Sequence, residues 1–132
     1  MVKKQLLFIL LILSIGHLSA QTLTVRIENT DIGRGYLMIG IFNNDVNFPD
    51  SFFIGDRISV SDNITIVTFN DLPVGRYAVS VYQDSNNNGQ LDRGIFGIPK
   101  EKYGFSNGAR RPNFNDSSFD FSENMTITIQ IR

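Results

Sequence analysis

Oxygen-bearing side chains recur at alternate positions in residues 84–92, which read DSNNNGQLD. Asp84, Asn86 and Asn88 take the first, third and fifth places, Gly89 takes the sixth and Asp92 the ninth. When a chain curls around an ion, side chains at alternate places point inward, and glycine makes the sharp turn with positive φ. Hard cations prefer oxygen ligands. The segment therefore predicts a calcium-binding loop.

The predicted ligand set needs one carboxylate from outside the loop. The twelfth place is Ile95, where a complete EF-hand has a bidentate glutamate. Glu101, Asp116 and Asp71 are the candidates for this carboxylate, in that order. With two charged loop residues, the expected dissociation constant lies at about 10⁻⁴–10⁻³ M, the range of extracellular modules. The full set, in which Gln90 acts through its backbone carbonyl, is Asp84, Asn86, Asn88, Gln90, Asp92 and Glu101.

A metal-free interpretation fits the same residues. Asn88-Gly89 is a strong indicator of a hairpin turn, and Asp and Asn side chains can satisfy the backbone groups of a loop without an ion. The sequence leaves both interpretations open.

A second candidate region is the stretch 94–117, which shows no strand period although it is rich in aromatic residues. Long segments without regular structure are uncommon in compact domains unless they bind something or pack on themselves. In the first case, the aromatic loop 94–114 with Arg110 and Arg111 predicts a metal-free surface that binds a glycan or peptide of the cell envelope or the medium. In the second case, the rings are buried and hold the loop down.

The composition excludes several kinds of catalytic site. His17 is the only histidine, and the chain has no cysteine and no tryptophan. If the N-terminal segment that holds His17 is cleaved off, the remaining chain has no histidine and no cysteine. We therefore do not expect a catalytic triad with histidine, zinc bound by imidazole, or haem held by histidine or cysteine. A carboxylate-based hydrolase is the enzymatic alternative, but the acidic residues lie in Asn-rich turns or on polar strand faces. We expect a non-enzymatic binding or scaffolding protein.

Residues 1–20 have the pattern of a secretory signal peptide, in which Lys3 and Lys4 precede an apolar run and small residues end at Ala20. The run is shorter than the roughly 20 residues that a membrane span needs. We therefore expect export to the periplasm or the medium, no membrane span after cleavage, and a single domain at residues 21–132. Losing two lysines leaves ten basic against thirteen acidic residues, and this net charge of −3 argues against nucleic acid as a partner.

Apolar residues alternate with polar ones in several short segments, which is the period of a strand with one buried face. Such segments lie at residues 23–28, 77–81 and 125–131, while residues 36–42 are apolar on both faces and predict a central strand. The fold expected is all-β, a two-sheet antiparallel sandwich with Greek-key connections of the transthyretin-like or Ig-like kind. An up-and-down barrel is the alternative. Tyr77, which follows the turn at residues 72–75, is expected to hydrogen-bond back across a sandwich corner.

The stretch from Phe69 to Phe119 resembles the bacterial domain-of-unknown-function family 2141. The resemblance rests on the pattern LPVGRYA at residues 72–78, the Asn-rich turn, GIPKE at 97–101, GFSN at 104–107 and PNF at 112–114. It implies a small exported β-sandwich with no established activity and supplies no catalytic residues. The family commonly has a histidine before the first aspartate of the turn and an acidic residue after it, where this chain has Gln83 and Ser85.

Overall fold

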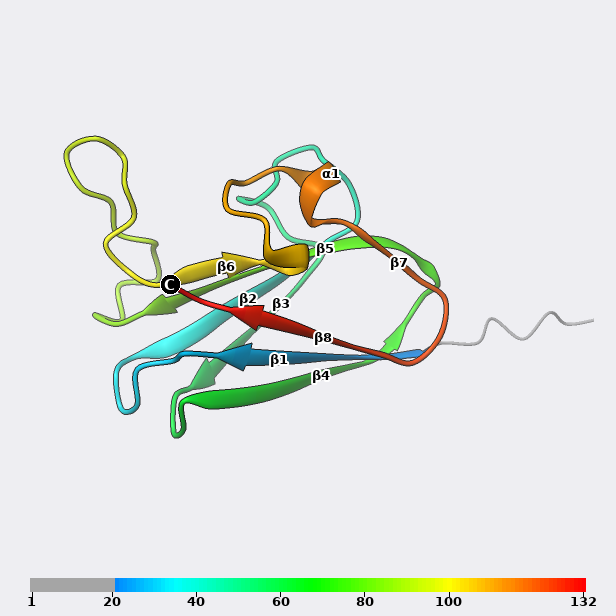
Figure 1. The fold of residues 1–132 in the computed structure, drawn as a ribbon, viewed down its shortest axis with the longest axis horizontal. Coiled ribbons are helices and arrows are strands. Elements are labelled where there is room, and N and C mark those ends of the chain that lie inside the picture. Colours follow the sequence, from blue (N-terminus) through cyan, green and yellow to red (C-terminus); the bar gives the residue numbers. More distant parts are fainter. Residues whose placement is uncertain (1–20) are drawn as a thin grey trace, which may run out of the picture.

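Strands make up most of the regular structure in residues 21–132, which are the residues that the computed structural model describes (Figure 1). The predicted signal peptide, residues 1–20, lies outside this part. No helix in residues 21–132 is long and apolar enough to cross a membrane. The strands are β1 (Gln21–Glu28), β2 (Tyr36–Phe42), β3 (Ile54–Ser59), β4 (Ile64–Leu72), β5 (Gly75–Asp84), β6 (Tyr103–Phe105), β7 (Phe119–Phe121) and β8 (Met125–Gln130).

The strands form two sheets that face each other, so the predicted all-β sandwich is confirmed. One sheet has the order β4–β1–β8, and the other has the order β3–β2–β5–β6 with β7 paired to the start of β5. The chain crosses from one sheet to the other after β1, β3, β4 and β7, as expected for Greek-key rather than up-and-down connections.

The two-residue period places the core between the sheets. Leu23, Val25 and Ile27 on β1 are fully buried, and Val79 and Val81 on β5 face them from the other sheet. Central strand β2 is covered on both faces by side chains and loops, which matches its continuous apolar sequence. Burial of these alternating side chains supplies most of the driving force for folding.

One strand pair runs in a direction that the sequence did not predict. β8 lies parallel to β1, with Leu23 opposite Met125 and Ile27 opposite Ile129, whereas the other strand pairs of residues 21–132 are antiparallel. The alternation of apolar residues shows which face of a strand is buried, but it carries no information on the direction of the neighbouring strand.

The stretch 94–117, expected to lack regular structure, contains three short elements. β6 pairs with β5, a 3₁₀ turn covers Ser106–Gly108, and the one-turn helix α1 covers Phe114–Ser117. The side chain of Asn113 caps α1 by accepting a hydrogen bond from the backbone N–H of Asp116. Elements of three or four residues are too short to show a sequence period.

The turn between β4 and β5 is held by the corner that the sequence predicts. The hydroxyl of Tyr77 donates a hydrogen bond of 2.7 Å to the backbone carbonyl of Pro73, four residues earlier. Burial raises the pKa of this phenol above its usual 10.0, so it remains a donor. The corner fixes the point at which the chain leaves one sheet and enters the other.

We expect Tyr77→Phe to lower the free energy of unfolding by about 1 kcal/mol, because the part-buried hydrogen bond to the carbonyl of Pro73 is lost. Urea denaturation measures this change. Tyr36→Phe is the matched control, since the hydroxyl of Tyr36 has no hydrogen bond within residues 21–132 while its ring lies 3.8 Å from the Arg57 guanidinium. Equal stability of wild type and Tyr77→Phe would show that the corner is not a stabilising contact.

Candidate functional site

The candidate calcium loop begins where β5 ends. Asp84, the last residue of β5, is fully buried. Its carboxylate accepts hydrogen bonds from the backbone N–H groups of Asn88 at 3.2 Å and Gly89 at 2.8 Å. Gly89 has φ +75°, a conformation that glycine adopts without strain. The first and sixth places of the pattern therefore shape the loop together.

Three of the predicted ligand side chains point at one another across the loop. The side-chain amide nitrogens of Asn86 and Asn88 both donate to the carboxylate of Asp92, the second at 2.8 Å. A half-turn of an amide about its last side-chain bond exchanges its nitrogen and its oxygen, so either atom can face the same point. Gln90 contributes its backbone N–H, which donates to the side-chain oxygen of Asn88 at 3.0 Å, while its side chain is exposed.

Glu101 lies beneath the loop and joins its two ends. One carboxylate oxygen accepts from the backbone N–H of Ser85 at 2.9 Å and from its hydroxyl at 3.1 Å. The other oxygen accepts from the backbone N–H of Asp92 at 3.0 Å. Glu101 is nearly buried, with 9% of its surface exposed. Its carboxylate therefore holds the loop closed at its base.

The other two candidates for the remote carboxylate make no contact with the loop. Asp116 lies in α1, where its backbone carbonyl accepts from Asn107. Asp71 lies near the end of β4, next to the start of β5. Because β5 has ten residues, its two ends are about 30 Å apart, and Asp71 is remote from the loop.

The carboxylates in and beneath the loop accept hydrogen bonds from loop residues. Asp84 and Glu101 accept from backbone N–H groups, and Asp92 accepts from two amides. No group of three or more His, Cys, Asp or Glu side chains in residues 21–132 is arranged to hold a metal ion. The donor set consists of oxygen atoms and fits calcium by its chemistry, provided that the two amides turn their oxygens inward.

Tyr82 connects the loop to the sheet. Its hydroxyl donates to the backbone carbonyl of Gly89 at 3.1 Å. Burial raises the pKa of this phenol above 10.0, and the negative charges of Asp84 and Glu101 raise it further. Because the pKa is raised in the folded state, the contribution of the neutral phenol to stability is complete below pH 10 and is lost as the pH rises through the raised value.

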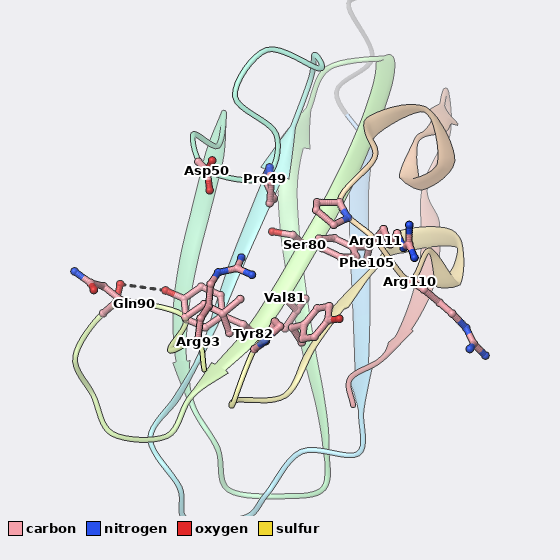
Figure 2. A pocket seen from close by; sticks show the side chains of 15 residues that line it. Pro49, Asp50, Ser80, Val81, Tyr82, Gln90, Arg93, Phe105, Arg110 and Arg111 are labelled. Carbon is pink, nitrogen blue, oxygen red and sulfur yellow. Dashed lines mark hydrogen bonds between the residues drawn. The ribbon is translucent and has the colours of Figure 1, made fainter. Parts of the chain in front are cut away.

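A groove of about 530 Å³ opens beside the loop, over the outer face of β5 and β6. Figure 2 shows Tyr82 and Arg93 on one side of it and Phe105 and Arg111 on the other. The loop itself supplies part of one wall. The lining residues are Pro49, Asp50, Ser80, Val81, Tyr82, Gly89, Gln90, Leu91, Arg93, Pro99, Tyr103, Phe105, Arg110, Arg111 and Pro112.

The aromatic residues of the 94–114 stretch divide into two groups. Phe105 is buried and lies 5.7 Å from the ring of Phe48, which also contacts Phe42 and Phe114. These rings hold the second half of the stretch against the sheet, as the packing interpretation expects. Phe96, by contrast, is 89% exposed. Aromatic content alone could not tell which rings are buried.

Gln83, the residue before the first aspartate of the loop, was not predicted as a structural residue. It is 2% exposed. Its side-chain oxygen accepts from the backbone N–H of Asp31, and its nitrogen donates to the carbonyls of Asp31 and Arg34. Beside it, Gly35 approaches β5 so closely that a Cβ atom there would lie 1.8 Å from the carbonyl oxygen of Asp84. The one feature of the sequence that indicated burial of Gln83 is its position two residues after Val81, on the face of β5 that points into the core.

We expect Glu101→Ala to lower the free energy of unfolding by about 2 kcal/mol, because two backbone donors lose a charged acceptor. Amide hydrogen exchange gives the sharper measurement, since protection should be lost at the N–H groups of Ser85 and Asp92. Glu123→Ala, at an exposed residue between β7 and β8, is the matched control. Retained protection at both amides in Glu101→Ala would contradict the proposed role of this carboxylate.

Several residues of the motifs that carry the family resemblance make hydrogen bonds that connect neighbouring segments of this structure. Tyr77 makes the corner, Glu101 closes the loop, and Ser106 and Asn107 donate hydrogen bonds to the backbone carbonyls of Ser117 and Ser118. Comparison with curated proteins and with solved structures gives no significant match. A family model described as "Uncharacterized protein conserved in bacteria (DUF2141)" matches residues 25–129. With most of its length matched, the chain belongs to the DUF2141 family.

Proposed function

We propose that the protein is an exported, non-enzymatic binding module in which loop 84–92 binds Ca²⁺ and thereby stiffens one wall of the groove. The observation that supports calcium most is the convergence of Asn86, Asn88 and Asp92 above a buried Glu101. Export is supported by the signal-peptide pattern of residues 1–20. The remaining predicted ligands are Asp84 and the backbone carbonyl of Gln90.

The loop and the groove share residues, which links metal binding to ligand binding. Gly89, Gln90 and Leu91 line the groove, and the hydroxyl of Tyr82, another lining residue, donates to the carbonyl of Gly89. An ion held by the loop side chains restricts the motion of this wall. A preformed wall lowers the entropy that a ligand must lose to bind.

The acidic residues around the groove support a binding role over hydrolysis. Asp50 is the single carboxyl among its lining residues. A neighbouring depression over β2 and β3 has Asp50 and Asp56, and both are exposed. A glycosidase pair needs one carboxyl sheltered from water so that it stays protonated.

We expect about 10 mM Ca²⁺ to raise the free energy of unfolding by about 1.4–2.7 kcal/mol, since this concentration is roughly 10–100 times the expected dissociation constant. Thermal melts with calcium and with a chelator measure the effect. Calcium should also lower the pKa of Tyr82, because the cation offsets the charges of Asp84 and Glu101. Phenolate absorbance during alkaline titration reports this second change.

Asp92→Asn should abolish the calcium effect, because it removes the charge on which the two amides converge. Asp120→Asn, at an exposed residue of β7, makes the same chemical change away from the loop and should keep the effect. Identical melting midpoints for wild type with calcium and with chelator would refute calcium binding.

Binding without a metal is the second candidate function, and the charge of the groove favours it. Arg93, Arg110 and Arg111 all line the groove, and none of them forms an ion pair within residues 21–132. Tyr82 and Tyr103 supply aromatic surface beside them. Guanidinium groups next to rings suit a ligand that combines carboxylates with a ring, and an acidic glycan has both.

We expect an oligosaccharide of uronic acids to bind more tightly than a neutral one of equal length, with an affinity that falls as salt rises. Titration calorimetry in the presence of a chelator measures the affinity for each oligosaccharide and its dependence on salt, without a contribution from calcium. Arg111→Gln should weaken binding by roughly tenfold, the effect of one charge-assisted hydrogen bond. Arg34→Gln, at an exposed residue outside the groove lining, is the control. Equal affinity for acidic and neutral oligosaccharides would argue against this ligand class.

A further inference from the structure

Three large apolar side chains lie exposed at the tip of one short segment. Ile95, Phe96 and Ile98 are 96%, 89% and 66% exposed. Single exposed apolar residues are ordinary on protein surfaces, but adjacent ones mark interaction sites. We call residues 93–99 the finger.

The finger is held in a closed turn, so its tip cannot fold back onto the groove without breaking hydrogen bonds. Its base is a bridge between Arg93 and Pro99. Gly94 donates its N–H to the carbonyl of Ile98 at 2.8 Å, and Gly97 donates to the carbonyl of Gly94 at 3.0 Å. Figure 1 shows this yellow-green loop reaching beyond the end of the sandwich, on the side of β6.

Basic residues flank the apolar tip. Arg93 and Lys100 stand on either side of it in sequence, both exposed, and residues 93–100 contain no acid. Two acids adjoin this run in sequence, and both already accept hydrogen bonds. Asp92 accepts from the side chains of Asn86 and Asn88, and Glu101 accepts from the backbone N–H groups of Ser85 and Asp92. An apolar tip with a basic collar is complementary to the surface of an anionic bilayer, where apolar groups enter the acyl boundary and cations meet the headgroups.

We propose that the finger inserts into the surface of an anionic lipid bilayer and holds the protein there reversibly. The size of the tip favours a bilayer over a protein partner. Three side chains offer roughly 500 Å² of apolar surface, whereas a stable protein interface buries about 800 Å² on each partner. Insertion needs no complementary partner surface, and one apolar anchor combined with basic residues is a known basis for reversible membrane binding.

Tryptophan fluorescence provides a direct measurement, because the chain contains no tryptophan. The Phe96→Trp variant, as recovered after export, is mixed with phosphatidylglycerol–phosphatidylcholine vesicles in chelator, which keeps the result independent of calcium. We expect the emission to shift to the blue and to be quenched by lipids brominated on their acyl chains. Val46→Trp is the control, since Val46 is 66% exposed in the β2–β3 connection. Its emission should not change.

Vesicle sedimentation tests whether the apolar side chains at the tip of the finger are needed for membrane binding. Phe96→Ser should reduce the bound fraction at limiting lipid by roughly tenfold, and replacing phosphatidylglycerol by phosphatidylcholine should reduce it similarly. Ile66→Ser, at a 60% exposed residue of β4, should bind as wild type does. Unfolding in urea should be unchanged in both variants, because neither side chain is buried.

Three results would overturn the proposal. The first is an emission spectrum of Phe96→Trp that vesicles do not alter, and the second is an equal shift in Val46→Trp. The third is self-association in the absence of lipid that Phe96→Ser abolishes, because a second copy of the chain would then be what covers the tip.

Discussion

The site depends on one carboxylate that bonds to backbone groups on both sides of a loop. Glu101 accepts from Ser85, which follows β5, and from Asp92, nine residues before Glu101. This pairing sets the spacing of the loop ends and therefore the direction in which Asn86, Asn88 and Asp92 point. The finger begins directly after Asp92, so its orientation is set at the same place. Loop 84–92, the groove wall that it supplies and the finger are therefore all positioned by Glu101.

Two separate apolar clusters stabilise different parts of the molecule. The core between the sheets includes Val25, Val79 and Val81 and holds the strands together. A smaller cluster on the outer side of β5 and β6, centred on Phe48, holds the 3₁₀ turn and α1. Loop 84–92 and the finger belong to neither cluster and rely on hydrogen bonds.

Much of the fold could be predicted because period and turn chemistry are local properties. The burial of Leu23 and Val25, the corner at Tyr77 and the turn at Gly89 all follow from residues close in sequence. What could not be predicted depends on distant partners. One example is the parallel direction of β8, and another is the contact of Gln83 with the β1–β2 connection. A third is that Phe105 is buried whereas Phe96 is exposed. The sequence ranks Glu101 first of the three acids proposed for the remote ligand, but only the tertiary structure shows that it lies beneath the loop.

The parallel alignment of β1 and β8 has a kinetic consequence. β1 is the middle strand of its sheet, and its partner β8 lies about a hundred residues later in the chain. The ordering entropy of so long an intervening segment must be lost before that contact forms, and sandwiches of this topology fold slowly for that reason. During synthesis, β1 therefore lacks one of its two neighbouring strands until β8 has emerged.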